Sequence, residues 1–190
     1  MTRFSALSLL LLLGACHSRS TDSTSPTPAG SVATHAASRV TFAIIDSAGR
    51  RVGQVSAVET GAGVQLDVFV AGMPPGMHGM HLHDAGLCEA PAFTTAAGHL
   101  NPASRQHGHK NPLGAHQGDL PNLVIDPKGV GRARVLIAAV TLQPPAPSIA
   151  GPGTALVIHA DPDDELTDPT GNSGVRIACG VITDLHSRYP

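Results

Sequence analysis

The sequence predicts an all-β protein, an eight-stranded antiparallel Greek-key β-barrel or sandwich of the immunoglobulin-like type. Short runs rich in Val, Ile and Leu alternate with Gly, Pro and Asp, and no stretch has a helical periodicity. The 190 residues include 21 Gly and 16 Pro but only 3% aromatic residues, which suits a turn-rich domain. Both observations favour short strands joined by turns and loops.

Eight segments fit this pattern, and we expect a strand in each. In VQLDVFV, residues 64–70, four aliphatic residues fall on one face and Gln65, Asp67 and Phe69 on the other, as in a half-buried antiparallel strand. In chain order the segments are RVTFAIID, RVGQVSAVE, VQLDVFVAG, GMHLH, NLVID, GRARVLIAAV, GTALVIHA and VRIACGVIT.

Two long connections interrupt this spacing. Residues 84–121 contain no strand or helix signal, and residues 161–174, DPDDELTDPTGNSG, form a shorter polar segment. Loops of this length in a small domain usually carry function. Most of the histidines and many of the acidic residues lie in or beside them.

The N-terminus is typical of an exported protein. Arg3 precedes an apolar run over residues 4–13, which is too short to span a bilayer, and LGAC resembles the lipobox before Cys16. We therefore expect a lipoprotein signal peptide (1–15), a lipid-anchored flexible linker (16–38) and one folded domain (39–190). An ordinary signal peptide with an incidental cysteine is the alternative. Because His17, and not Asp, follows the cysteine, we expect the periplasmic side of the outer membrane.

The cysteine count supports an oxidising compartment. If Cys16 carries lipid, only Cys88 and Cys179 remain, and they should pair in the periplasm. Two buried free thiols are the alternative.

Composition argues against nucleic-acid binding. The formal net charge is -2, no long basic run is present, and five aromatic residues are too few for a base-stacking platform.

The histidines favour a metal site. His81 and His83 are two residues apart in an expected strand, so both rings point to one side and can reach one metal. A loop set of nitrogen and oxygen donors fits tetrahedral zinc. A single histidine is more often a surface or core residue, but the chain has 11 His against two Lys. The other candidates are His99, His107, His116, Asp119 and His159.

These residues lie in motifs of a known family. GMHGMHLH resembles the first signature of copper/zinc superoxide dismutases, G-x-H-G-(F/Y)-H-x-H, and GNSGVRIACGVI resembles the second. AGHLNP, RQHG, HQGDLPNL and VIHADPDD match in order between them, so the resemblance covers about residues 40 to 185. It implies a superoxide dismutase that cycles between Cu(II) and Cu(I), with a structural zinc ion and with long metal-binding and channel loops.

The resemblance also implies a role for each matched residue. Cys88 and Cys179 match the intrasubunit disulfide, Asp163 the aspartate that orients a ligand of each metal, and Arg176 the arginine at the channel mouth, where it attracts superoxide. His78 matches a framework histidine, and His109 and His186 match nothing. The channel loop before Arg176 contains no lysine, so we expect weaker electrostatic steering. The implied copper ligands are His81, His83, His99 and His159, and the implied zinc ligands are His99, which bridges the two ions, with His107, His116 and Asp119.

Three interpretations compete. A dismutase would convert superoxide to oxygen and hydrogen peroxide as an antioxidant defence in the periplasm. A non-catalytic copper/zinc buffering protein would need no Arg176, and an adhesive sandwich would need no histidines. The sequence is compatible with a monomer or a homodimer attached to the membrane through its lipid.

Overall fold

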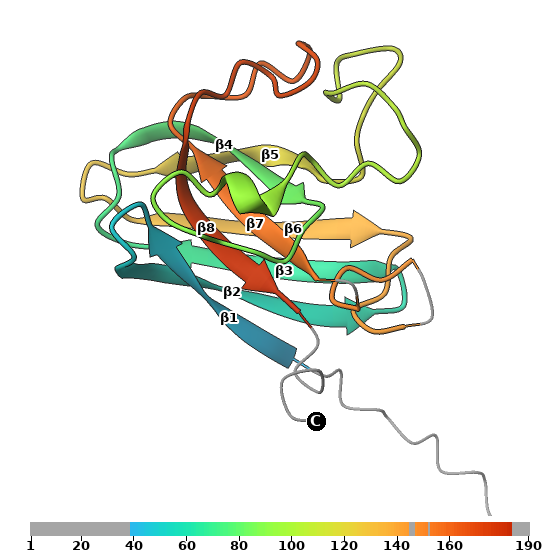
Figure 1. The fold of residues 1–190 in the computed structure, drawn as a ribbon, viewed down its shortest axis with the longest axis horizontal. Helices are drawn as coiled ribbons and strands as arrows, with labels where there is room; N and C mark the ends of the chain where they lie inside the picture. The colour runs from blue at the N-terminus through green and yellow to red at the C-terminus, as the bar shows by residue number, and fades with distance from the viewer. Residues whose placement is uncertain (1–38, 145–146, 152, 184–190) are drawn as a thin grey trace, which may run out of the picture. The chain divides into compact units, whose positions relative to one another are not determined.

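Eight strands form where the sequence alternates between apolar and polar residues. In the computed structural model, which describes residues 39–144, 147–151 and 153–183, they close into an antiparallel barrel (Figure 1). The predicted fold class is confirmed. The strands are β1 (Arg39–Asp46), β2 (Arg51–Thr60), β3 (Gly63–Val70), β4 (Gly76–His83), β5 (Asp119–Ile125), β6 (Gly131–Ala138), β7 (Thr154–His159) and β8 (Arg176–Ile182).

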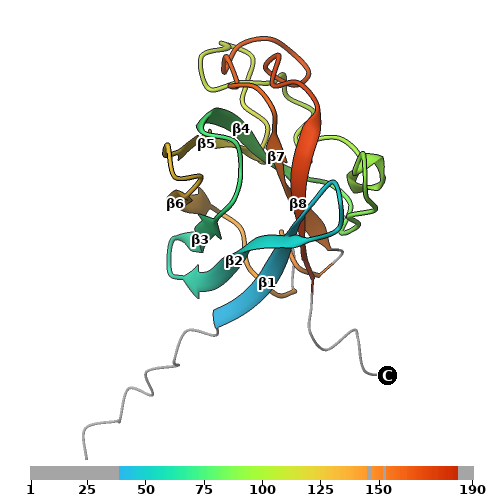
Figure 2. The same cartoon turned by 90° about the vertical axis from the view of Figure 1, so that its left-hand side faces the viewer.

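The order of strands around the barrel is β1-β2-β3-β6-β5-β4-β7-β8. β3 is hydrogen-bonded to β6 although β4 follows it in the sequence, which is a Greek-key connection. Few residue pairs join the strands at two seams of the barrel. β5 pairs with β6 only at Ile125 and Gly131, and β1 pairs with β8 over only two residue pairs. Between these seams lie two four-stranded walls, so the term sandwich also applies (Figure 2).

Alternation along the strands decides which side chains face the core. Leu66 of β3, like Met80 and Leu82 of β4, is fully buried in one large apolar cluster inside the barrel. Because neighbouring residues of a strand point to opposite faces, His81 and His83 point out of the barrel. The predicted placement of these two rings on one side of a strand is confirmed.

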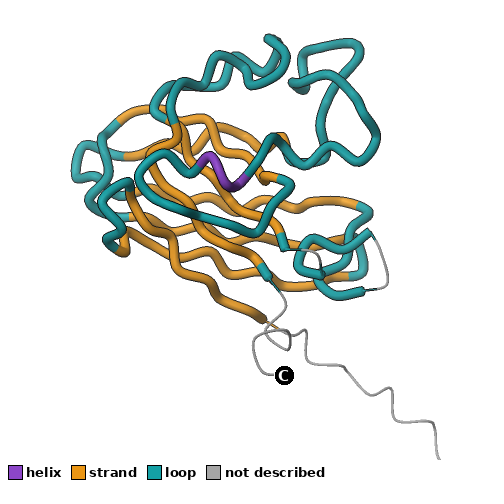
Figure 3. The backbone as a smooth tube through the Cα atoms, in the orientation of Figure 1, coloured by secondary structure: helices purple, strands orange, loops and turns teal. Residues whose placement is uncertain are grey.

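The two long connections lie outside the strands (Figure 3). The first was expected to lack regular structure up to about residue 121, but it contains one turn of 3-10 helix, η1 (Thr94–Ala96), and β5 already begins at Asp119. Phe93, beside η1, is fully buried in a small apolar cluster with Val157 of β7, which explains why this part of the loop is ordered against the barrel. A disulfide between Cys88 and Cys179 joins the same loop to β8, as expected.

No helix in the described part of the chain is long and apolar enough to cross a membrane. The predicted signal peptide, Cys16 and the linker lie outside the described residues, as does His186.

Candidate metal centre

Four histidines direct one ring nitrogen each toward a common point outside the barrel wall. His81 and His83 lie on β4, His159 ends β7, and His99 lies on the first loop, where it forms an isolated β-bridge with His83. These four donor atoms lie within 4.8 Å of one another. Buried polar atoms are normally hydrogen-bonded, so a cluster without partners needs another explanation, and a cation provides one. The buried nitrogens without a hydrogen-bond partner are His81 Nδ1, His83 Nε2, His99 Nε2 and His159 Nε2.

The opposite nitrogens of three of these rings are held by oxygen atoms. Carbonyl and carboxylate oxygens accept hydrogen bonds, so the contacting nitrogen carries the proton and the lone pair of the other nitrogen faces the common point. The chain itself therefore sets the tautomer of each ring. The contacts are His81 Nε2 to Asp163 Oδ2 at 2.7 Å, His83 Nδ1 to Ala97 O at 2.9 Å, and His159 Nδ1 to Gly174 O at 3.1 Å.

A second cluster surrounds one carboxylate oxygen, Asp119 Oδ1. It lies 3.0 Å from Nδ1 of both His99 and His107, and 3.2 Å from Nδ1 of His116. The His99 and His116 Nδ1 atoms are themselves 3.3 Å apart. Three nitrogens and one oxygen thus converge as the ligands of a tetrahedral cation do.

The two clusters are adjacent. His99 contributes Nε2 to the first cluster and Nδ1 to the second. His81 also offers a nitrogen within 4.8 Å of donor atoms of His99, His107 and Asp119. Two cations held here would therefore be close neighbours on either side of the His99 ring.

The carboxylate of Asp163 connects the clusters from behind. Its Oδ2 accepts a hydrogen bond from His81 Nε2, and its Oδ1 accepts one from His107 Nε2 at 3.0 Å. The side-chain amide of Asn122 holds the backbone of Asp163 through two hydrogen bonds of 2.8 Å, one to its N–H and one to its carbonyl. Gly171 lies against the carboxylate with φ of +62°, and a Cβ there would lie 1.8 Å from Asp163 Oδ1. A side chain at this position would displace the carboxylate.

Burial keeps three imidazoles of the first cluster neutral. Burial lowers the pKa of His83 to about 2, of His99 to about 4 and of His159 to about 3. The nearby Arg176 charge further lowers the pKa of His83 and His159. These imidazoles are unprotonated at neutral pH, so their lone pairs are available to a metal.

The second cluster holds charge instead. Burial alone would lower the pKa of His107, but its hydrogen bonds to Asp119 and Asp163 raise it to about 9. Burial would raise the pKa of both carboxyl groups, but hydrogen bonds with His107 and neighbouring histidines hold them well below the usual range. Both aspartates are therefore ionised throughout the neutral range.

Arg176 lies beside the first cluster. It is the first residue of β8, and the sheet register places it opposite His159. Its guanidinium donates hydrogen bonds of 2.6 Å to the carbonyls of Phe93 and Ala97, and Ala97 O also accepts from His83. Burial lowers the pKa of Arg176, but a guanidinium remains charged at neutral pH. A fixed positive charge therefore stands next to the four converging nitrogens.

Two described histidines, His78 and His109, were not predicted to bind a metal. His78 is buried and hydrogen-bonded to backbone, with Nδ1 2.8 Å from His159 O, as expected for a framework residue. His109 is exposed as expected, although its Nε2 also lies 3.1 Å from Asp119 O.

Three contributors were missed. Asn122 and Gly171 lie within or next to the matched motifs, but their contacts with Asp163 connect residues far apart in the sequence. Lys110, from the first loop, lies with Nζ 3.5 Å from Glu165 Oε2 of the channel loop. The absence of lysine from the channel loop therefore does not leave that loop without a neighbouring cation.

Comparison with known proteins places this site in a family. The family described as copper/zinc superoxide dismutase (SODC) matches residues 51–182. The Cu-Zn superoxide dismutase 2 of Aquifex aeolicus is 44% identical over 73% of this chain and 83% of that protein. The Cu-Zn superoxide dismutase of Caulobacter vibrioides is 37% identical over 70% of this chain and 79% of that protein.

A solved structure agrees with the barrel. The crystal structure of a SOD-like protein from Bacillus subtilis superposes with a TM-score of 0.71, at 34% identity over 75% of this chain and 97% of that chain. The family match covers most of the described barrel and both long loops, and the histidine and aspartate clusters that could hold copper and zinc lie within it. The chain belongs to the copper/zinc superoxide dismutase family.

Proposed function

We propose that the first cluster binds copper and the second binds zinc, and that His99 bridges the two ions in a periplasmic superoxide dismutase. The observation that carries this proposal is the His99 ring, whose two nitrogens face the two clusters. The proposed copper ligands are His81, His83, His99 and His159, and the proposed zinc ligands are His99, His107, His116 and Asp119.

The donor sets suit these ions. Neutral imidazoles are good ligands for copper, and three nitrogens with one carboxylate oxygen fit tetrahedral zinc. When bound, copper supplies the one-electron exchange with superoxide. Asp163 fixes one ring of each set, so the donor atoms are arranged before a metal arrives.

The chain's own residues handle the anion and a proton. One superoxide loses an electron and leaves as oxygen, while a second gains an electron and two protons and leaves as hydrogen peroxide. Arg176 attracts and orients the anion. His99 is held through Nδ1 by the second cluster, so its Nε2 can take up and release a proton while the ring keeps its position. Solvent supplies the other proton.

Metal buffering without turnover is the alternative function. Metal buffering requires both clusters, but it gives no reason for the partly buried Arg176 guanidinium beside the proposed copper ligands. The two hydrogen bonds that hold Arg176 in place favour the dismutase. All proposed ligands belong to one chain, so catalysis requires no second copy, and a homodimer remains compatible with the proposal.

We also infer export and attachment to the periplasmic face of the outer membrane through acylated Cys16. The support is the LGAC motif after the apolar run of residues 4–13. The mass of the mature protein from membranes should equal that of the chain from Cys16 plus acyl groups. Cys16→Ser should move the protein to the soluble fraction. A mature chain that begins beyond Cys16 would contradict this inference.

Gly171→Ala should weaken retention of both metals, because its Cβ would displace the Asp163 carboxylate that orients a histidine of each cluster and would also lie 2.6 Å from His107 Nε2. We expect copper and zinc affinities to fall by about 10- to 100-fold, measured by competition with a chelator. Gly49→Ala is the matched control, because Gly49 also has a positive φ, +76°, but nothing lies within 4 Å of its Cβ position. Equal losses in both variants would mean that backbone strain, and not the carboxylate, is responsible.

Zinc binding to the metal-free protein should release about one proton at pH 7.5. The pKa of His107 is raised to about 9, so its ring is protonated at this pH and must lose the Nδ1 proton to bind a cation. Zinc affinity should therefore rise with pH up to about 9. Calorimetry in buffers of different ionisation enthalpy measures the release, and the same titration at pH 9.5 should release much less. No buffer dependence at pH 7.5 would contradict this assignment.

Arg176→Ala should lower the rate of superoxide decay by the copper- and zinc-loaded enzyme about tenfold or more, because the fixed charge beside the proposed copper ligands is lost. Arg176→Lys should recover part of the rate and its dependence on ionic strength. Arg132→Ala, on the opposite wall of the barrel, removes the same charge and should have little effect. If the fully loaded wild-type protein decays superoxide no faster than buffer, metal buffering is the function.

A further inference from the structure

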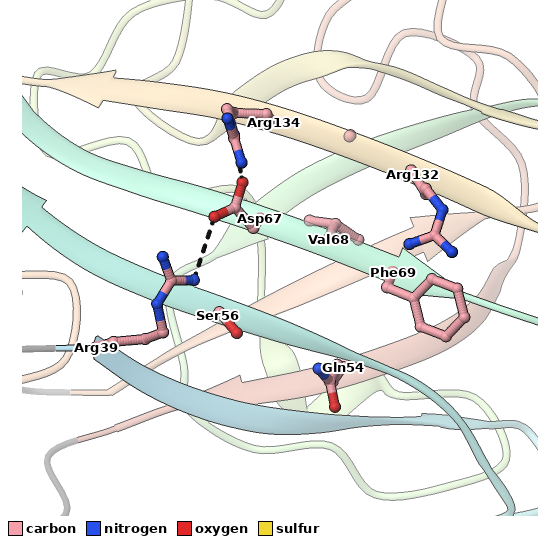
Figure 4. A pocket seen from close by; sticks show the side chains of 9 residues that line it. Arg39, Gln54, Ser56, Asp67, Val68, Phe69, Arg132 and Arg134 are labelled. Atoms are coloured by element: carbon pink, nitrogen blue, oxygen red, sulfur yellow. Dashed lines mark hydrogen bonds and ion pairs between the residues drawn. The ribbon is translucent and has the colours of Figure 1, made fainter.

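The wall of the barrel opposite the metal centre carries an unusual concentration of arginine. Arg39 begins β1, Arg51 begins β2, and Arg132 and Arg134 lie on β6. We call these four arginines, with Gln54, Ser56, Asp67 and Phe69, the basic face, and Figure 4 shows all of them except Arg51. All four arginines are exposed. Except for Arg51, they line a shallow hollow of about 520 Å³ that also includes Asp67 and Phe69.

Strand register builds this face. Asp67 of β3 is paired with Arg134 of β6, and Phe69 with Arg132. Leu66, Val68 and Val70 alternate with them on β3 and are buried in the core, so Asp67 and Phe69 point outward. The basic face is therefore a property of the sheet and does not depend on a loop conformation.

Positive charge on the basic face exceeds negative charge. Asp67 is its one carboxylate, and it is shared between Arg134, with Nε 2.5 Å from Oδ1, and Arg39, with NH1 3.3 Å from Oδ2. Arg132 stacks 4.5 Å above the Phe69 ring and has no carboxylate partner among the described residues. Four guanidinium groups thus face one carboxylate in a chain whose formal net charge is -2.

Arg51 has no carboxylate partner within the described residues either. Its guanidinium donates to Gly53 O at 3.3 Å and to Gln54 Oε1 at 3.1 Å. Exposed guanidinium groups that are held by stacking or by neutral acceptors keep free N–H donors, which match phosphate oxygens in geometry.

We propose that the basic face docks on an anionic membrane surface through lipid phosphate groups. Charge complementarity is the first argument. The second is the position of Arg39, because residues 1–38 join the described structure there, at the edge of the basic face. A flexible linker of the length and composition of residues 17–38 has a root-mean-square end-to-end distance of about 25 Å, so an acylated Cys16 would hold the barrel near the membrane. The choice of a membrane as partner rests on the proposed acylation, whereas the preference for phosphate follows from the basic face itself.

Docking in this orientation leaves the metal centre accessible. In the closed strand order, β2 and β3 lie opposite β4 and β7, which carry His81, His83 and His159. The basic face and the candidate metal centre are therefore on opposite sides of the barrel, and superoxide could still reach Arg176 from the solvent side.

The test uses the full chain with Cys16→Ser, so that no acyl chain contributes. Sedimentation with vesicles of phosphatidylglycerol and phosphatidylethanolamine measures binding, and vesicles of phosphatidylcholine are the neutral reference. Arg51→Gln with Arg132→Gln removes two charges without breaking a described ion pair. Arg105→Gln with Lys110→Gln, in the loop between β4 and β5, removes the same charge on the other side of the barrel. Asp67→Asn removes the carboxylate of the basic face.

We expect the basic-face double variant to lose about tenfold or more of its binding to anionic vesicles. The control pair should lose less than about twofold, and Asp67→Asn should bind more tightly, with all effects reduced at about 150 mM salt. Superoxide decay should stay unchanged in the basic-face variants. Equal losses in both double variants would mean that vesicle binding depends on the net charge of the protein and not on the basic face, which would overturn the proposal. Tighter binding to a DNA duplex than to anionic vesicles would also overturn it.

Discussion

The hydrogen bonds of the Asp163 carboxylate are the interaction on which the candidate metal centre depends. This carboxylate is buried, and a buried charge is costly unless its oxygens are satisfied. Here the oxygens accept from His81, from His107 and from the N–H of Glu165. The contacts with His81 and His107 fasten the channel loop to β4 and to the first loop. Loss of this carboxylate would therefore affect both the orientation of His81 and His107, which are proposed metal ligands, and the attachment of the channel loop.

A second shared group, the carbonyl of Ala97, connects the charge of Arg176 to the proposed ligand set. It accepts hydrogen bonds from His83 and from Arg176, so one peptide unit positions a proposed copper ligand and the cation beside it. The loop that carries Ala97 is held to β8 by the disulfide of Cys88 and Cys179 and to β7 by the burial of Phe93. These contacts hold the loop against the barrel, and the loop in turn holds His83 and Arg176 through the Ala97 carbonyl.

The sequence predicts those features that arise from regular geometry. The alternation in residues 64–70 identifies β3 and its buried face, and the spacing of His81 and His83 places both rings on one side of a strand. The resemblance to a known family, and not periodicity, supplied the roles of the loop residues. The sequence does not predict contacts between segments that are distant in sequence, such as the two hydrogen bonds between the Asn122 side chain and the Asp163 backbone. A close approach of this kind depends on the paths of two irregular loops, for which no residue pattern exists.

The distribution of charge gives a physical reason for two separate cationic regions. The chain has a formal net charge of -2 and an anionic substrate, so a local charge must overcome the average repulsion. The proposed role of Arg176 suits this need, because a charge that is partly buried beside the proposed copper ligands is less screened by solvent than an exposed one. The exposed arginines of the basic face would draw anions to the wrong side of the barrel. If phosphate groups of a membrane neutralise the basic face, Arg176 would account for a larger share of the positive electrostatic potential that superoxide meets from the solvent side.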